Sequence, residues 1–190
     1  VLTRAMTDKL LIEEGRVSGV SFRVAGEAAV ARAGREVILS AGAVNSPKIL
    51  ELSGIGRPDI LSDLDIPVTH ALDGVGENLQ DHLQIRTVFK LKNAKTLNEQ
   101  ANSLFGKAKM GMQYLMNQSG PLSMAPSQLG IFAKSDPRLE TPDLEYHIQP
   151  LSTDKLGEPL HPYPAVTASV CNLRPESRGS IHATSLNIND

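Results

Sequence analysis

The feature that most constrains the fold of this chain is a corner of small residues between an apolar run and a helix start. The run is Glu36–Ser40, and Ala41-Gly42-Ala43 follows it directly. A short apolar run of this kind is typical of a buried parallel strand. Ser46 is a good N-cap and Pro47 suits the first helical position, so a helix is expected from there until Ser53-Gly54 ends it.

Such a corner has two interpretations. Gly42 and Ala43 leave room for a flat ring or a sugar to approach the backbone, and the free N–H groups of the following helix point toward the same loop. The alternative is a plain strand–turn–helix packing corner, and the residues by themselves favour that second interpretation.

The rest of the chain predicts a mixture of strands and helices. Alternating or β-branched runs predict strands at Lys9–Glu13, Val17–Val24, Ala28–Ala31, Arg86–Leu91, Leu129–Lys134, Leu144–Ile148, Ala165–Asn172 and Ser180–Ser185. A short helix is expected at 58–64 and a longer one at Asn98–Asn117. The broad apolar face of the longer helix comprises Leu104, Phe105, Ala108, Met112, Leu115 and Met116.

Composition excludes several classes of protein. The chain has 190 residues, which suits one large domain or two small lobes, and its formal net charge is -2. No Lys/Arg-rich run favours a nucleic-acid or membrane-surface partner, and no apolar run reaches membrane-spanning length. The single cysteine, Cys171, excludes an internal disulfide. No signal peptide is visible, which favours the cytoplasm, and the opening Val1-Leu2 suggests a chain cut from a longer one.

Three stretches carry a family resemblance. Residues 42–56 read Gly-Ala-Val-Asn-Ser-Pro-Lys-Ile-Leu-Glu-Leu-Ser-Gly-Ile-Gly, which closely resembles the second signature of the glucose–methanol–choline oxidoreductases. Residues 74–82 resemble the loop by which that family enters its substrate domain, and residues 174–180 resemble a late turn of the same domain. The resemblance therefore runs along nearly the whole chain.

The resemblance implies an α+β fold in two parts. Residues 1–82 would be the middle of an FAD-binding α/β domain, incomplete in itself, and 83–190 most of a substrate-binding domain with an antiparallel sheet and a packed helix. The implied enzyme is an FAD-dependent oxidoreductase that takes hydride from the CH–OH group of a small alcohol. The family's Gly-rich phosphate loop has no counterpart here, because the sequence holds no G-x-G-x-x-G.

The family's catalytic His also lies outside the stretches that match. We therefore expect no catalytic residue within the chain, no activity from the chain alone, and self-association through apolar surface left uncovered. The alternative is a non-catalytic binding or scaffold module derived from the same fold.

Nine residues are candidates for ligand contacts by resemblance. The adenosine half of FAD would lie along Ala41, Gly42 and Ala43, with a main-chain contact to adenine from Thr7; Asn78, in the loop 74–82, is the fifth cofactor candidate. The four remaining candidates, which would face the substrate, are His147, Gln128, Ser127 and Lys90.

Each substrate candidate also has an ordinary structural interpretation. A neutral imidazole at His147 can donate one hydrogen bond and accept another, so it could hold an alcohol oxygen, or it could simply bond to the backbone. Ser127 and Gln128 could equally be loop surface, and Lys90 a solvated strand residue. A Lys at that position would repel choline, and no His/Cys spacing resembles a metal-ligand set, so no metal site is expected.

Overall fold

The computed structural model describes residues 1–125, 127–155 and 157–190, which fall into two compact units. Unit 1 comprises Val1–Gln80 and Ser177–Asp190, and unit 2 comprises Asp81–Glu176. The resemblance predicted a boundary near residue 82, with all of residues 83–190 in the second lobe. In the structure the last fourteen residues, Ser177–Asp190, belong to unit 1.

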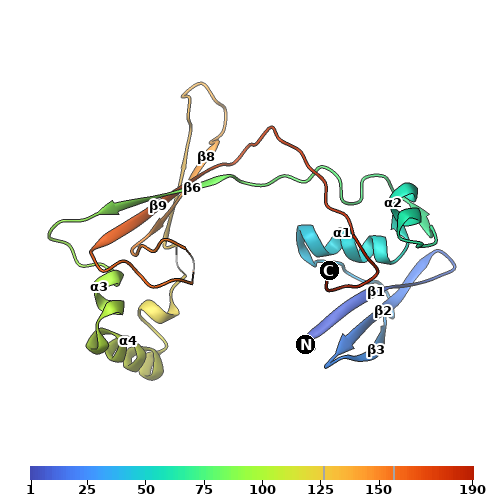
Figure 1. The fold of residues 1–190 in the computed structure, drawn as a ribbon, viewed down its shortest axis with the longest axis horizontal. Coiled ribbons are helices and arrows are strands. Elements are labelled where there is room, and N and C mark those ends of the chain that lie inside the picture. Colours follow the sequence, from blue (N-terminus) through green and yellow to red (C-terminus); the bar gives the residue numbers. More distant parts are fainter. Residues whose placement is uncertain (126, 156) are drawn as a thin grey trace. The chain divides into compact units, whose positions relative to one another are not determined.

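Unit 1 is built on an antiparallel meander (Figure 1). Its strands are β1 (Ala5–Glu13), β2 (Arg16–Val24) and β3 (Glu27–Arg32), in the order β1-β2-β3. The tight turn between β1 and β2 places Gly15 at φ 76°, a conformation that glycine adopts without steric cost. All three strands predicted for this region are therefore confirmed, each slightly longer than expected.

Helix α1 (Gly42–Leu52) lies against β1, and a side chain joins the two. The Leu10 N–H donates to Ser53 Oγ at 2.8 Å, and that hydroxyl donates to the Ile49 carbonyl at 2.5 Å. The chain continues through β4 (Ile55–Gly56), α2 (Pro58–Asp63) and β5 (His70–Ala71), where β4 and β5 form a short parallel pair. The short helix predicted at 58–64 is confirmed.

Two predictions around α1 were wrong. The helix begins at Gly42 with Ala41 as its N-cap, so Pro47 lies inside it, and the Ser46 hydroxyl accepts the Ala41 N–H at 3.0 Å. Residues 36–40 form no strand, and Ile38 is 80% exposed. A parallel strand needs a partner on at least one edge, and no described strand of this chain pairs with that run.

Residues 177–190 hold to unit 1 by backbone and buried side-chain contacts. Leu79 and Gly179 form an isolated antiparallel bridge, and the Ile181 N–H donates to the Gly76 carbonyl at 2.8 Å. The strand predicted at Ser180–Ser185 is absent because this segment pairs with a loop at single positions and not with a sheet edge.

A buried carboxylate completes that attachment. Glu51 on α1 is fully buried, and it accepts hydrogen bonds from His182 Nδ1 and from the Ala183 N–H, both at 2.7 Å. His182 Nε2 lies 3.2 Å from Glu77, which in turn pairs with Arg57 at 2.9 Å. Desolvating a carboxylate is costly unless it is paired, so these donors are what make its burial tolerable.

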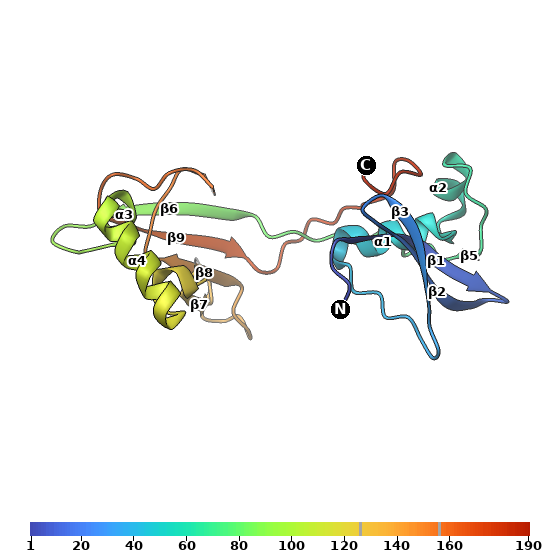
Figure 2. The same cartoon turned by 90° about the horizontal axis from the view of Figure 1, so that it is seen from below.

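Unit 2 contains a four-stranded antiparallel sheet (Figure 2). The strands are β6 (Gln84–Lys90), β7 (Leu129–Ala133), β8 (Leu144–Gln149) and β9 (Ala165–Asn172), in the order β6-β9-β8-β7. All four strands predicted here are confirmed. On one face most side chains are apolar. The other face carries polar side chains, among them Arg86, Ser169 and His147, which lie in one row across β6, β9 and β8.

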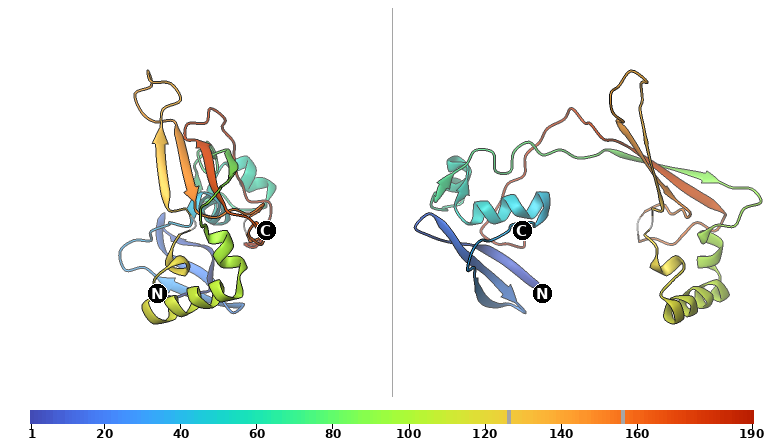
Figure 3. Two further views of the ribbon diagram at one scale, coloured as in Figure 1. Left: turned by 90° about the vertical axis from the view of Figure 1, so that its left-hand side faces the viewer. Right: turned by 180° about the vertical axis from the view of Figure 1, so that it is seen from behind.

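The long predicted helix is two helices in the structure, α3 (Leu97–Asn102) and α4 (Leu104–Asn117) (Figure 3). Ser103 breaks it with extended dihedrals and caps α4 through a 2.8 Å bond from the Gly106 N–H. The apolar face expected to pack on the sheet is instead exposed at Leu104, Phe105, Met112, Leu115 and Met116. The α4 residue that is buried is Met110, which that face did not include.

The mixed α and β class with antiparallel sheets is confirmed. Among the described residues, no helix combines the length and the apolar character needed to cross a membrane.

Candidate functional site

A groove of about 620 Å³ lies in unit 1 between the first half of α1 and the loop that follows β5. Its lining is mostly apolar and main chain, contributed by Ala43, Ser46, Pro47, Leu50, Leu72, Gly74, Val75, Gly76, Glu77, Asn78, Leu79, Gln80 and Ile181. A concave, mainly apolar surface with a few polar groups is the usual form of a cofactor or small-molecule site.

Backbone conformation shapes the floor of this groove. Gly76 has φ 77°, and a Cβ added there would come within 2.2 Å of the Ile181 carbonyl oxygen, so only glycine lets the loop and the returning segment approach so closely. Asn78 also has positive φ, at 59°. Gly42 and Gly74 have no atom within 4 Å of an added Cβ, so a planar ligand could approach the backbone at both.

The groove gathers part of the predicted cofactor set. Ala43 and Asn78 both line it, and Ala41 and Gly42 come directly before Ala43 at the start of α1. Thr7 lies on β1 opposite Phe22, at an irregularity in the β1–β2 register, and does not line the groove. Sequence reasoning missed Ile181, because it assigned that residue to a strand of the other lobe.

Three of the four predicted substrate residues lie close together in unit 2, His147 on β8 and Ser127 and Gln128 just before β7. His147 pairs with Gly130 on β7 and with Ser169 on β9. The Gln128 N–H donates to the Ile148 carbonyl at 3.1 Å, and Ser127 Oγ accepts from Gln149 Nε2 at 3.1 Å. Ser127 and Gln128 therefore lie beside the end of β8 that follows His147.

Lys90 is separate from this group. It lies on the edge strand β6 opposite Ala165, whereas His147 is opposite Ser169 on the same β9, four residues further along. At roughly 3.3 Å per residue this separates the two positions by about 13 Å along the strands, and β9 lies between them. The Lys90 ammonium lies 4.2 Å from the centre of the Tyr163 ring, a cation–π contact.

That separation weakens the expectation that Lys90 excludes a cationic substrate. Two unit charges about 13 Å apart in water repel by only about 0.3 kcal/mol, which is too little to exclude a cation from His147. The nearest charged group to His147 is a carboxylate, because Glu145 Oε1 lies 3.5 Å from His147 Nε2.

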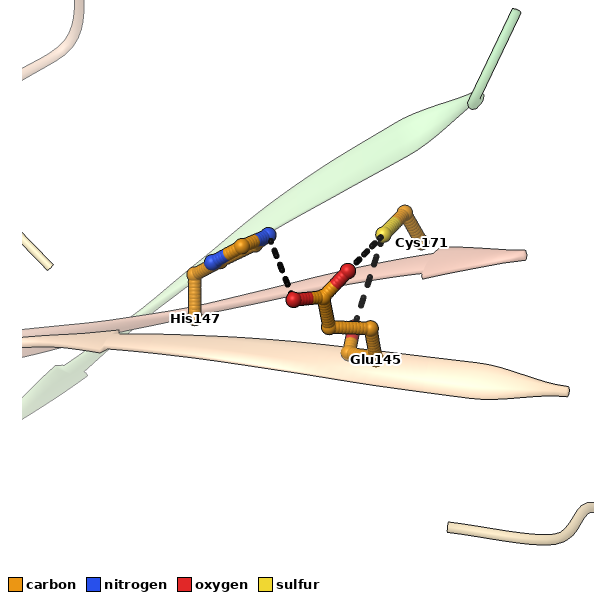
Figure 4. A group of neighbouring side chains, drawn as sticks. All are labelled: Glu145, His147 and Cys171. Atoms are coloured by element: carbon orange, nitrogen blue, oxygen red, sulfur yellow. Dashed lines mark hydrogen bonds and ion pairs between the residues drawn. The ribbon is translucent and has the colours of Figure 1, made fainter. Parts of the chain in front are cut away.

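The structure also joins two side chains to His147 that the sequence did not. Glu145 shares its face of β8, and Cys171 on β9 is directly opposite Glu145 (Figure 4). Burial, and secondly the neighbouring Glu145, raises the pKa of the Cys171 thiol. The two-residue spacing of Glu145 and His147 on a strand could have indicated that they share a face. The position of Cys171 beside them could be found only from the register between β8 and β9.

Comparison with known proteins identifies the family. Residues 1–84 match the family model described as GMC oxidoreductase. The chain is 38% identical over 183 residues to an oxygen-dependent choline dehydrogenase of Chromohalobacter salexigens, covering 96% of this chain and 33% of that protein. The chain belongs to the GMC oxidoreductase family and spans about a third of the length of the curated relatives it matches.

Solved structures agree on the fold. The crystal structure of a formate oxidase superposes with a TM-score of 0.83 at 24% identity, covering 98% of this chain and 37% of that one. An FAD-dependent oxidoreductase from Chaetomium thermophilum superposes with a TM-score of 0.75 at 21% identity, covering 100% of this chain and 39% of that one. At these identities the likeness extends to the fold alone.

Proposed function

We propose that this chain is part of an FAD-dependent oxidoreductase that oxidises the CH–OH group of a small alcohol to a carbonyl. The observation that carries the proposal is the groove in unit 1. Its lining includes Ala43, Ser46 and Pro47 from the family's second signature and Asn78 from the loop 74–82. Relatives at 38% identity are named as choline dehydrogenases, which agrees with an alcohol substrate.

The residues of the groove fit the adenosine half of FAD. The walls are mostly apolar, main chain is open at Gly74, and Ser46 and Asn78 supply polar groups. When bound, FAD supplies the acceptor for the hydride of the alcohol. In this proposal Ala41, Gly42, Ala43 and Asn78 hold the cofactor, with Thr7 contributing main chain from β1.

His147 is proposed to hold the alcohol oxygen. The Glu145 carboxylate, 3.5 Å from Nε2, favours a proton on that nitrogen and leaves Nδ1 as the acceptor for the substrate hydroxyl. Ser127 and Gln128 lie beside the end of the same strand and would bound the substrate, while Lys90 is proposed to act at the other end of the sheet. No residue of this chain is proposed as the catalytic base, so the chain alone should not turn over.

Flavin content tests the groove assignment. In the full-length protein, Ala43→Trp should fill the groove and lower the FAD absorbance per chain to a small fraction of the wild-type value. Val44→Trp is the matched control, because Val44 is the next residue on α1, is 55% exposed and does not line the groove. Equal flavin content in the two variants would contradict the assignment.

The substrate class is tested by an alcohol panel with FAD-loaded protein. Choline and pyridoxine belong in it because relatives named for these substrates match the chain. Turnover of at least one primary or secondary alcohol supports the proposal.

A further inference from the structure

A cluster of three potential metal ligands lies on the polar face of the unit 2 sheet. Glu145 and His147 alternate along β8, so their side chains share a face, and Cys171 on β9 is paired with Glu145. His147 Nε2 lies 3.5 Å from Glu145 Oε1, and Cys171 Sγ lies 3.9 Å from Glu145 Oε2. The donor atoms of the three all lie within 4.8 Å of one another.

These separations approach those of a tetrahedral zinc site. Zinc bonds of about 2.0–2.3 Å to oxygen, nitrogen and sulfur place neighbouring ligand atoms about 3.3–3.6 Å apart. The distances of 3.5 Å and 3.9 Å involve different oxygens of Glu145, and all donor atoms lie within 4.8 Å, so side-chain rotations would have to bring them to the tetrahedral spacing.

The cluster is open on one side. The side chains of Glu145 and His147 are 19% and 34% exposed, whereas Cys171 is buried, and Glu145 lies between the other two (Figure 4). An ion can therefore enter from the side of the carboxylate and the imidazole and meet the sulfur last. Three protein ligands leave the fourth tetrahedral position to water.

We propose that Glu145, His147 and Cys171 form a binding site for Zn²⁺ or a similar borderline divalent transition-metal ion. The sulfur and imidazole donors disfavour Mg²⁺ and Ca²⁺, which take oxygen ligands. The site shares His147 with the proposed substrate contacts, whereas none of the three residues lines the groove of unit 1.

Binding has a defined proton requirement. The Cys171 thiol must lose its proton to solvent when it ligates the ion, so the observed affinity should rise with pH. Burial and Glu145 both raise the pKa of the free thiol and strengthen that dependence. The other charged or titratable groups on this face of the neighbouring strands are His147 on β8 and Arg86 and Lys90 on β6.

Cobalt titration tests the site, and Cys171 is the only cysteine of these 190 residues. One equivalent of Co²⁺ should produce a thiolate-to-cobalt charge-transfer band, and one equivalent of Zn²⁺ should abolish it. Cys171→Ser should lose the band entirely. His147→Gln and Glu145→Gln should each weaken binding by roughly tenfold or more, since even changes to residues around the ligands cost about 10–100-fold.

His70→Gln is the matched control, because His70 is exposed on β5 of unit 1 and should leave the titration unchanged. Absence of the band in the wild-type protein overturns the proposal without reference to any variant. A band of unchanged strength in both His147→Gln and Glu145→Gln also overturns it, since it would show metal binding by a lone thiol. The titration uses no flavin or alcohol, so either result leaves the proposed function to its own test.

Discussion

Replacing Glu51 by alanine should destabilise unit 1 by about 3–5 kcal/mol, because it leaves the donors that face a fully buried carboxylate without their acceptor. Glu51 is fully buried and accepts two bonds of 2.7 Å, from His182 Nδ1 and the Ala183 N–H. Each hydrogen bond to a charged group contributes about 1.5–3 kcal/mol, so two lost bonds give a similar figure. Glu51→Gln keeps one acceptor and should cost about half as much.

Urea denaturation measures this effect. With a slope of about 2 kcal/mol per molar, the alanine variant should lower the midpoint of unit 1 by roughly 1.5–2.5 M. The three tyrosines, Tyr114, Tyr146 and Tyr163, all lie in unit 2. Tyrosine fluorescence should therefore keep its midpoint while far-ultraviolet circular dichroism shows the earlier transition of unit 1.

Glu36→Ala is the control, because Glu36 is exposed, and surface changes of this kind usually stay within about 0.5 kcal/mol. A Glu51→Ala midpoint no lower than that of Glu36→Ala would refute the reasoning that Glu51 fixes residues 177–190 to α1. If the midpoint of the tyrosine signal shifted equally, the claim that the destabilisation is confined to unit 1 would be refuted.

Three further predictions concern other parts of the chain. Gly76→Ala should lower the free energy of unfolding by at least about 1–2 kcal/mol, because its φ of 77° is left-handed and the added Cβ would meet the Ile181 carbonyl. Gly74→Ala is the control in the same urea assay and should be nearly neutral, because a Cβ there meets open space. Hydrogen bonds from the side chain and backbone of Ser135 lower the pKa of Asp143 below its ordinary value of 3.8, so this carboxylate stabilises the β7–β8 connection above that pH. That stability is lost as the pH falls through the lowered pKa, and a wild-type acid-denaturation curve identical to that of Asp143→Asn would contradict the assignment. The apolar residues exposed on α4 should make the isolated chain bind a hydrophobic dye and self-associate, and Phe105→Lys combined with Leu115→Lys should reduce both; unchanged dye fluorescence and sedimentation would count against α4 as the surface responsible.

The local patterns that could be predicted from the sequence are those whose cause is itself local. Alternation and a glycine turn placed β1, β2 and β3, and Ala165–Asn172 was located to the residue. The strand expected at Glu36–Ser40 failed because a buried strand depends on partners far away in sequence. The single helix expected at Asn98–Asn117 failed at Ser103, whose hydroxyl caps a new helix instead of continuing the old one.

The candidate site residues also divide into those that the sequence could identify and those that only the fold brings together. Ala43 and Asn78 were identified by resemblance, and the fold places both in one groove. Cys171 was not connected to His147, because its proximity follows from the pairing of β8 with β9, which no spacing in the sequence specifies, whereas the i, i+2 spacing of Glu145 and His147 could have connected those two. Lys90 was grouped with His147 by resemblance, and its position opposite Ala165 on β9 depends on register, which the sequence does not specify.

Anaerobic mixing of the FAD-loaded full-length protein with primary and secondary alcohols tests the proposed function most directly. At least one alcohol should bleach the visible flavin band, and His147→Ala should slow that bleaching with flavin content unchanged. The isolated chain, incubated with FAD and desalted, should retain no flavin band. A full-length protein whose flavin is bleached by a chemical reductant but by none of the alcohols would contradict the assignment as an alcohol oxidoreductase.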